Sequence, residues 1–125
     1  IIITFFSNVN HLDVSIQLTL FNQILQNFVQ NAIKFTPNEK SIAIRLRKTK
    51  EKIIITVTDE GIGIPENVDL FAPFKRVGNQ SGVGLGLFLA KNAADALRAK
   101  ITLVNRDDDK TGCIAKLVLN HTSKV

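Results

Sequence analysis

Apolar and polar residues follow one another along the chain in runs that predict strands and two helices. The opening run at 1–6 is apolar and predicts a strand, and a second short strand is expected near 14–18. Over 20–35 the apolar residues recur with helical spacing, and the run stops at Thr36-Pro37. Because the residue before a proline avoids the helical region, this pair marks the end of a long predicted helix.

The remaining pattern predicts two hairpins and a second helix. Apolar residues alternate with polar ones over 41–47 and 52–58, which predicts an antiparallel pair, and 101–105 with 113–119 predicts another. A second helix is expected over 85–99. Helices on one face of a mixed, mostly antiparallel sheet give a two-layer sandwich of the α+β class.

The composition fits a single domain. With 45% hydrophobic content, residues 1–125 are expected to form one domain around one core. The chain starts with Ile1 and contains no Met, so we expect a fragment of a longer polypeptide. Sixteen basic against eleven acidic residues give a net charge of +5, which favours an anionic partner. The densest basic stretch, 45–52, straddles a predicted turn, where solvated charges are ordinary.

Two asparagines and a lysine share the polar stripe of the long predicted helix. Asn27, Asn31 and Lys34 follow one another at intervals of about one turn, and the apolar residues of the helix occupy the opposite arc. Asn is a poor helix former, so two of them in mid-helix carry a local cost. Amide oxygens can ligate a hard cation, and an ammonium group can meet phosphate oxygens. The alternative is a solvated face of Gln and Asn side chains.

A carboxylate follows the predicted strand at 52–58. By alternation, Asp59 points to the same side as Ile55 and is aimed at the core, where it needs hydrogen-bond donors. An exocyclic amine and a bound water would serve, and Gly61 and Gly63 would let a planar ring approach the backbone. The alternative is a turn in which Asp59 caps local N–H groups.

Glycines gather before the second predicted helix. Six of the seven glycines fall within 61–86, where periodicity is lost, and this predicts a mobile loop. The segment 82–87 runs into the helix and would present backbone N–H groups to an anion such as a triphosphate, unless it is a plain glycine-rich turn. Phe71 and Phe74 look like anchors that close this loop onto the core, and Arg76 could then reach a phosphate oxygen.

These four signals occur in an order that resembles the boxes of sensor histidine kinases. Segment 27–37 is similar to the N box, 59–65 to the first glycine box, 71–74 to the F box and 82–87 to the second glycine box. The resemblance runs from about residue 14 to the end of the chain. It implies the Bergerat ATP-binding fold of gyrase, heat-shock chaperone and mismatch-repair ATPases, in which ATP lies between the first long helix and a lid.

The resemblance also implies ATP and Mg²⁺ as cofactors and assigns roles to individual residues. Asn31 would ligate Mg²⁺ with Asn27 beside it, Lys34 would contact phosphate, and Asp59 would accept a hydrogen bond from the adenine amino group. Asn27, Lys34 and Arg76 are the implied catalytic residues. The residues implied to shape the base pocket, wrap the phosphates or belong to the lid are Gly61, Gly63, Ile64, Phe71, Phe74, Arg76, Gly82, Val83, Gly84, Leu85, Gly86 and Leu87.

Several positions depart from the family pattern or narrow its chemistry. Hydrolysing relatives carry a glutamate where this chain has Asn27, an amide that cannot take a proton, so transfer is favoured over hydrolysis. Thr19 stands where an acidic residue often opens the helix, although Thr can serve as an N-cap. Val83 replaces a hydroxyl residue. His11 and His121 lack the following acidic residue of a phosphoacceptor, so both are expected at the surface.

The sequence therefore predicts the cytoplasmic catalytic, ATP-binding domain of a two-component sensor histidine kinase, and it leaves open whether the parent protein is anchored in the membrane. The γ-phosphate would pass to a histidine on a separate dimerisation domain of the same parent protein. A response regulator would be an indirect partner. The alternatives are a serine kinase of the anti-sigma type and a module that binds nucleotide without catalysis. No nucleic-acid partner is expected, because the chain has no Tyr or Trp for stacking and its basic residues are scattered. No membrane contact by this domain is expected.

Overall fold

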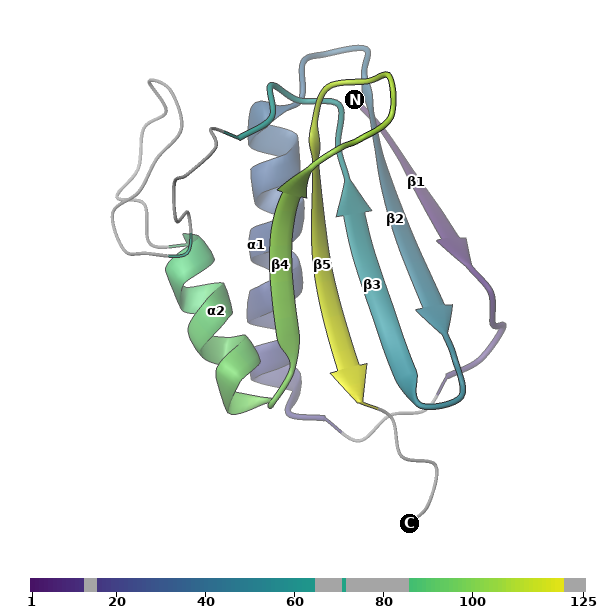
Figure 1. Cartoon of the computed structure of the whole chain (residues 1–125), viewed down its shortest axis with the longest axis vertical. Coiled ribbons are helices and arrows are strands. Elements are labelled where there is room, and N and C mark those ends of the chain that lie inside the picture. Colours follow the sequence, from purple (N-terminus) through teal and green to yellow (C-terminus); the bar gives the residue numbers. More distant parts are fainter. Residues whose placement is uncertain (13–15, 65–70, 72–85, 121–125) are drawn as a thin grey trace.

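The computed structural model describes residues 1–12, 16–64, 71 and 86–120 and shows helices packed on one face of a five-stranded sheet (Figure 1). The elements are β1 (Ile2–Ser7), α1 (Leu18–Phe35), β2 (Ser41–Lys48), β3 (Lys52–Thr58), α2 (Gly86–Ala96), β4 (Lys100–Asn105) and β5 (Cys113–Asn120). The strand order is β1-β2-β3-β5-β4, with β1 parallel to β2 and the other neighbours antiparallel. The predicted α+β sandwich with a mixed, mostly antiparallel sheet is confirmed.

The first helix begins earlier than predicted. The expectation of a short strand near 14–18 is wrong at Leu18, which is the first residue of α1, and residues 13–15 lie outside the described part. Apolar side chains at Leu18 and Phe21 already follow the helical spacing that continues through the buried Ile24. Thr19 lies inside the helix and is not its cap; the N-cap is Gln17, which makes no side-chain cap hydrogen bond.

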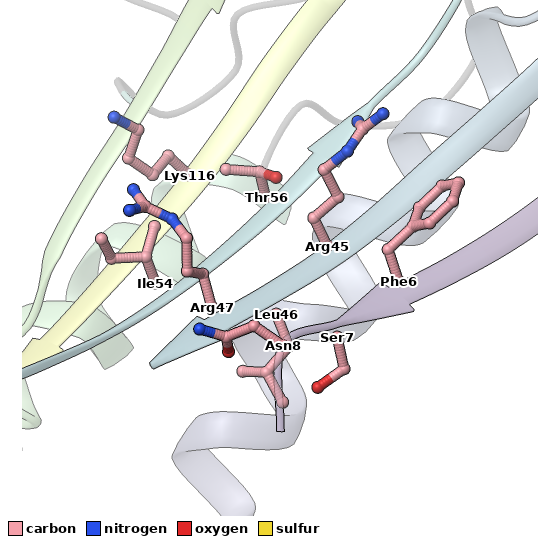
Figure 2. Close-up of a pocket in the computed structure, with 9 residues that line it drawn as sticks. All are labelled: Phe6, Ser7, Asn8, Arg45, Leu46, Arg47, Ile54, Thr56 and Lys116. Carbon is pink, nitrogen blue, oxygen red and sulfur yellow. The ribbon is translucent and has the colours of Figure 1, made fainter. Parts of the chain in front are cut away.

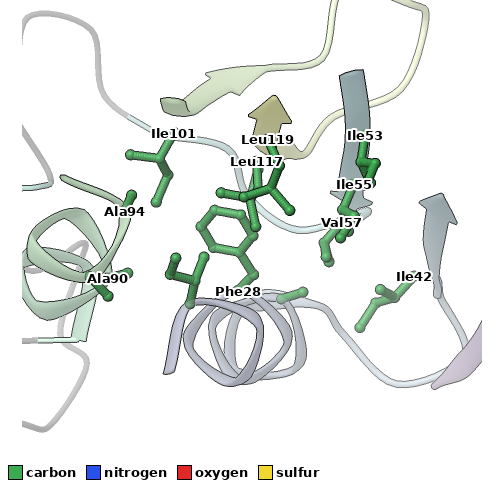
Figure 3. Close-up of a cluster of buried hydrophobic side chains, with 14 residues drawn as sticks. Phe28, Ile42, Ile53, Ile55, Val57, Ala90, Ala94, Ile101, Leu117 and Leu119 are labelled. Carbon is green, nitrogen blue, oxygen red and sulfur yellow. The ribbon is translucent and has the colours of Figure 1, made fainter. Parts of the chain in front are cut away.

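The core lies between the helices and the inner face of the sheet. Phe28 of α1 is buried and extends toward Leu117 and Leu119 of β5 (Figure 3). Removing such a ring costs about 3–5 kcal/mol, so this side chain fixes how α1 faces the sheet. The buried residues of α2 are Ala90, Ala93 and Ala94, and their small side chains let α2 pack closely against α1.

The second helix ends earlier than predicted, at Ala96 instead of residue 99. Arg98 has a φ of 59°, and the N–H of Ala99 donates to the carbonyl of Ala94 at 2.8 Å. This left-handed residue and backward hydrogen bond close a helix end and turn the chain into β4. Among the described residues, no helix combines the length and apolar character that crossing a membrane requires.

Candidate functional site

The polar stripe of α1 meets the start of α2. Asn27 and Asn31 are half-buried and Lys34 is exposed. The amide nitrogen of Asn27 donates to the carbonyl of Gln23 at 2.7 Å. Its amide oxygen faces α2, because a β-carbon added at Gly86 would lie only 2.5 Å from it. The structure therefore brings Asn27 and the last glycine of segment 82–86 into contact.

Lys34 lies in the last turn of α1. Its ammonium nitrogen is 5.7 Å from the centroid of the Phe35 ring, which is within reach of a cation–π interaction. A cation in the last turn also complements the negative end of the helix dipole.

Asp59 is buried at the end of β3, on the core side, as alternation predicts. Its Oδ1 atom accepts hydrogen bonds from the N–H groups of Gly61 and Cys113, each at 2.9 Å. The carboxylate thus has the donors that burial demands, and one of them is the local N–H expected from a turn. Both bonds use Oδ1, and within the described part Oδ2 accepts no hydrogen bond.

The end of β3 and the end of α1 lie against each other. A β-carbon added at Gly61 would lie 2.7 Å from the carbonyl oxygen of Phe35, so a side chain there would push these two segments apart. The next residue of the helix end, Thr36, is also buried, and within the described part its Oγ1 atom has no hydrogen-bond partner. The end of α1 and the end of β3 thus pack closely enough to bury this hydroxyl.

Gly112 and Arg106 support the backbone of Asp59 from the turn between β4 and β5. Gly112 has a φ of 137°, and an added β-carbon would lie 2.1 Å from the carbonyl oxygen of Asp59. Arg106 donates to the same carbonyl at 3.0 Å and pairs with both carboxylate oxygens of Asp108, at 3.1 and 2.6 Å. The ion pair raises the pKa of Arg106 and lowers that of Asp108.

Asn105 holds the segment that follows Asp59. Gly63 has a φ of 82°, which favours glycine, and an added β-carbon would lie 2.8 Å from the Asn105 Oδ1 atom. Asn105 accepts from the N–H of Ile64 at 2.8 Å and donates to the carbonyl of the same residue at 2.9 Å. One side chain therefore satisfies both backbone groups of Ile64 and fixes 63–64 beside the end of β4.

Glu60 joins β3 to the start of β2. Its Oε1 atom accepts from the N–H and the hydroxyl of Ser41, at 2.8 and 2.9 Å, and its Oε2 atom lies 3.4 Å from the ammonium group of Lys110. The two hydrogen bonds from Ser41, with a smaller contribution from Lys110, lower the pKa of Glu60 to about 2. This carboxylate is thus ionised at neutral pH and holds the strand ends together.

Cys113 lies behind Asp59 and is buried. Burial, and to a smaller extent the charge of Asp59, raises the pKa of the Cys113 thiol to about 12. The thiol is therefore protonated at neutral pH, and we assign it a packing role rather than a nucleophilic one.

The described residues include only part of the predicted lid. Phe71 and Leu87 are half-buried and pack against the hydrophobic core. The remaining predicted residues lie outside the described part of the chain: Phe74, Arg76, Gly82, Val83, Gly84 and Leu85. His11 is exposed, as predicted, and His121 lies outside the described part.

Sequence reasoning assigned no role to several residues that surround Asp59. Asn105, Arg106 and Gly112 come from the last hairpin, far along the chain from residues 59–64. Nothing in their local pattern marks them, because a polar turn with a glycine is expected in any hairpin. Only the pairing of β5 with β3 brings them to Asp59.

The long helix, the Asn27 amide beside Gly86 and the glycine contacts around the buried Asp59 carboxylate define a nucleotide-binding domain of the two-layer α+β class. Residues 17–122 match the family described as histidine kinase-, DNA gyrase B-, and HSP90-like ATPase. The chain belongs to this family.

Relatives in this family include several sensor kinases. The chain is 34% identical over 88 residues to the sensor protein KdpD of Mycobacterium tuberculosis. This alignment covers 66% of this chain and 10% of KdpD. It is 36% identical over 88 residues to the histidine-protein kinase ArlS of Staphylococcus aureus, covering 65% of this chain and 20% of ArlS. The chain thus spans only a tenth to a fifth of the length of these relatives.

Solved structures of histidine kinases share the fold. The catalytic domain of histidine kinase ThkA superposes with a TM-score of 0.84 at 30% identity, covering 97% of this chain and 79% of that one. The mycobacterial sensor histidine kinase MprB gives a TM-score of 0.81 at 24% identity, covering 95% of this chain and 82% of that one. A further ThkA structure contains the response regulator protein TrrA, with a TM-score of 0.77 at 28% identity, covering 96% of this chain and 34% of that one.

Proposed function

We propose that this chain is the ATP- and Mg²⁺-binding catalytic domain of a two-component sensor histidine kinase. The observation that carries this proposal is that one helix touches both halves of the predicted site. The amide of Asn27 faces Gly86, and at the helix end the carbonyl of Phe35, the residue after Lys34, contacts Gly61 beside Asp59. A nucleotide along α1 would thus have its base near Asp59 and its phosphates near Gly86.

The residues around Asp59 fit a purine base. Oδ2 of Asp59 would accept from the exocyclic amine of adenine, since Oδ1 is occupied by two backbone N–H groups. The unpaired hydroxyl of Thr36 is a second polar atom at this end of the helix. Gly61, Gly63 and Ile64 would form the wall of the base pocket, and Asn105 would hold that wall in place.

The residues along α1 fit the phosphates and a hard cation. Asn31 and Asn27 would offer neutral amide oxygens to Mg²⁺, and Lys34 would contact phosphate as a point charge. When bound, Mg²⁺ would neutralise charge on the triphosphate. Asn27 cannot accept a proton from water, so the domain would transfer the γ-phosphate rather than hydrolyse it. Arg76 and the backbone of 82–87 would complete the phosphate contacts.

The phosphoryl acceptor would be a histidine on a separate dimerisation domain of the same parent protein. A response regulator would then take the phosphoryl group from that histidine. The domain would work in the cytoplasm, where ATP is available, with no nucleic acid and no direct contact with the membrane.

Transfer in trans to a purified histidine-bearing hairpin domain tests the proposal. With γ-labelled ATP and Mg²⁺, we expect label on the hairpin domain that is lost in acid and kept in base, as for phosphohistidine. Asn31→Ala should abolish this label. Asn22→Ala, which changes an exposed asparagine of the same helix, is the matched control and should transfer normally.

Two outcomes would reject the kinase assignment. Label that survives acid would indicate phosphoserine and a serine kinase of the anti-sigma type. Nucleotide binding without any transfer to the hairpin domain would indicate a binding module without catalysis.

A further inference from the structure

The face of the sheet turned away from the helices is cationic. Successive strand residues point to opposite faces, and Ile42, Ile53 and Leu117 are buried on the helix side. The five exposed basic residues on the other side form what we call the cationic sheet face: Arg45, Arg47, Lys52, Lys100 and Lys116. Within the described strands there is no Asp or Glu residue on either face.

The strand register places four of these cations in two neighbouring rows across the sheet, and Lys52, which is paired with Asn120, lies in a third. Arg45 is paired with Thr56, which in turn is paired with Lys116. In the next row Arg47 is paired with Ile54. Neighbouring strands lie about 4.8 Å apart, so Arg45 and Lys116 rise from the sheet about 10 Å from each other. Residues 45 and 47 lie about 7 Å apart along β2.

A hollow lies between these rows (Figure 2). It has a volume of about 440 Å³, and its lining includes Arg45, Arg47 and Lys116 together with Phe6, Ile54 and Thr56. The floor is therefore mixed apolar and polar, and all charged side chains around it are positive. Such a site favours a ligand that combines carboxylates or phosphates with some apolar surface.

The rim of the hollow is held in place by the chain itself. The guanidinium carbon of Arg45 lies 4.9 Å from the centroid of the Phe6 ring, a cation–π contact that restrains the arginine. Beside it, Asn8 donates to the carbonyl of Lys48 at 3.1 Å and accepts from the N–H of the same residue at 2.9 Å. These bonds tie the end of β1 to β2 and fix the edge of the hollow.

Among the residues that the structure describes, no carboxylate neutralises the cations around the hollow. Within the described part, the ion pairs join Lys91 to Asp95, Arg106 to Asp108 and Lys110 to Glu60, all away from this face. Arg45, Arg47 and Lys116 make no ion pair or side-chain hydrogen bond there. An external anion would therefore meet three unneutralised charges on a rigid support.

We propose that the cationic sheet face is a docking surface for an acidic helix of a partner protein. Two residues seven positions apart on a helix are separated by about 10.5 Å, which matches the separation of Arg45 and Lys116. A helix lying across the strands along the row of Arg45 and Lys116 would place carboxylates over both cations, and its side toward the next row would place an apolar residue over Ile54. The hollow between the rows suits a protruding helix better than a flat bilayer surface.

The proposal is independent of the nucleotide site, which lies on the helix side of the sheet. It is tested with the 125-residue chain and a fluorescent alanine-based peptide of about 20 residues, long enough to be helical. The glutamates in this peptide are spaced three, four and seven residues apart. A control peptide carries glutamine at each of these positions. Fluorescence anisotropy at low and physiological salt reports the affinity.

Charge reversal at the hollow should weaken binding selectively. We expect Arg47→Glu with Lys116→Glu to lower the affinity for the acidic peptide by at least about tenfold, because attraction becomes repulsion at two contacts. The control Lys40→Glu with Arg98→Glu makes the same change in net charge at exposed sites away from this face and should change affinity less than about twofold. The neutral double variant Arg47→Gln with Lys116→Gln should lose an amount of affinity between those of the two charge-reversed double variants. Circular dichroism and nucleotide binding check that each variant is folded.

Three results would overturn the proposal. One is absence of peptide binding by the folded wild-type chain. Another is equal weakening by the two reversed pairs, which would show a general charge effect. The third is binding of vesicles rich in anionic lipid, or of a single-stranded oligonucleotide, that depends on Arg47 and Lys116 while the peptide does not bind.

Discussion

At the scale of single residues, the four glycines that the structure describes are placed where neighbouring atoms leave no room for a β-carbon. Gly61 lies against the carbonyl of Phe35, and Gly112 lies against the carbonyl of Asp59. In both cases the neighbour is backbone, which cannot move aside as a flexible side chain can. At Gly86 the neighbour is the side-chain amide of Asn27, which can move aside. A substitution at Gly86 is therefore expected to change nucleotide binding and to leave folding intact.

Gly86→Ala should weaken nucleotide binding without unfolding the chain. The atom that the new methyl group meets is the end of a flexible side chain, and Gly86 is the first residue of α2, so the thermal midpoint should change little. The new methyl group would displace the Asn27 amide, and the loss of one such contact lowers affinity by about tenfold. Isothermal titration calorimetry with a magnesium-nucleotide analogue measures the effect, and Leu89→Ala, at an exposed position of α2, is the control. Unchanged affinity in Gly86→Ala would contradict the assigned role of Asn27.

Glu60 gives the domain a specific dependence on acid. Its pKa falls from 4.5 to about 2 on folding, so the unfolded chain binds this proton more tightly than the folded chain does. The stabilising contribution is therefore present above pH 4.5 and is lost as the pH falls toward 2. Urea unfolding at several pH values should show that Glu60→Gln is less stable than wild type at neutral pH and that this difference shrinks in acid.

A matched change separates this effect from general acid denaturation. Glu51→Gln alters an exposed carboxylate in the turn between β2 and β3, and it should leave the pH profile of stability parallel to that of wild type. If the pH profile of stability of Glu60→Gln were also parallel to that of wild type, the hydrogen bonds from Ser41 would not be the source of the acid dependence.

At the scale of elements, periodicity predicted both helices and every strand of the sheet. The errors are the extra strand predicted near 14–18 and the ends of the two helices, where tertiary context decides. Leu18 could serve a strand or a helix by its own propensity, and its place is set by the packing of α1 that follows. The end of α2 depends on the left-handed backbone at Arg98, and an arginine in the sequence does not predict such a conformation. The parallel pairing of β1 with β2 is likewise not visible in the local pattern.

Asn105→Ala tests how much the end of β4 contributes to the site. The substitution removes the two hydrogen bonds to Ile64, and since Asn105 is exposed the loss of stability should be only about 1 kcal/mol. Freeing the segment 63–64 should lower nucleotide affinity several-fold, because that segment must then be ordered on binding. Thr102→Ala, on the same strand and facing the sheet surface away from the helices, is the control. Equal affinities for the two variants would show that Asn105 does not position the base pocket.

At the scale of the whole molecule, the sheet separates two surfaces of different chemistry. The inner side carries the core and the proposed nucleotide site, and the outer side carries the cationic sheet face. Sequence reasoning singled out Asn27, Asn31 and Asp59 as candidate site residues because their types conflict with their predicted surroundings. It treated the basic residues as scattered, since Arg47 and Lys116 lie far apart in the chain and only the pairing of β2 with β3 and of β3 with β5 brings them to one hollow.

The central claim is that Asn31, Asp59 and the glycine contacts serve one nucleotide site along α1. Isothermal titration calorimetry of a non-hydrolysable ATP analogue with Mg²⁺ tests it most directly, using wild type, Asn31→Ala and Asp59→Asn. We predict saturable binding to wild type and affinities at least about tenfold weaker for both variants, each still folded by circular dichroism. A folded wild type that shows no binding, or variants that bind as tightly as wild type, would contradict the account.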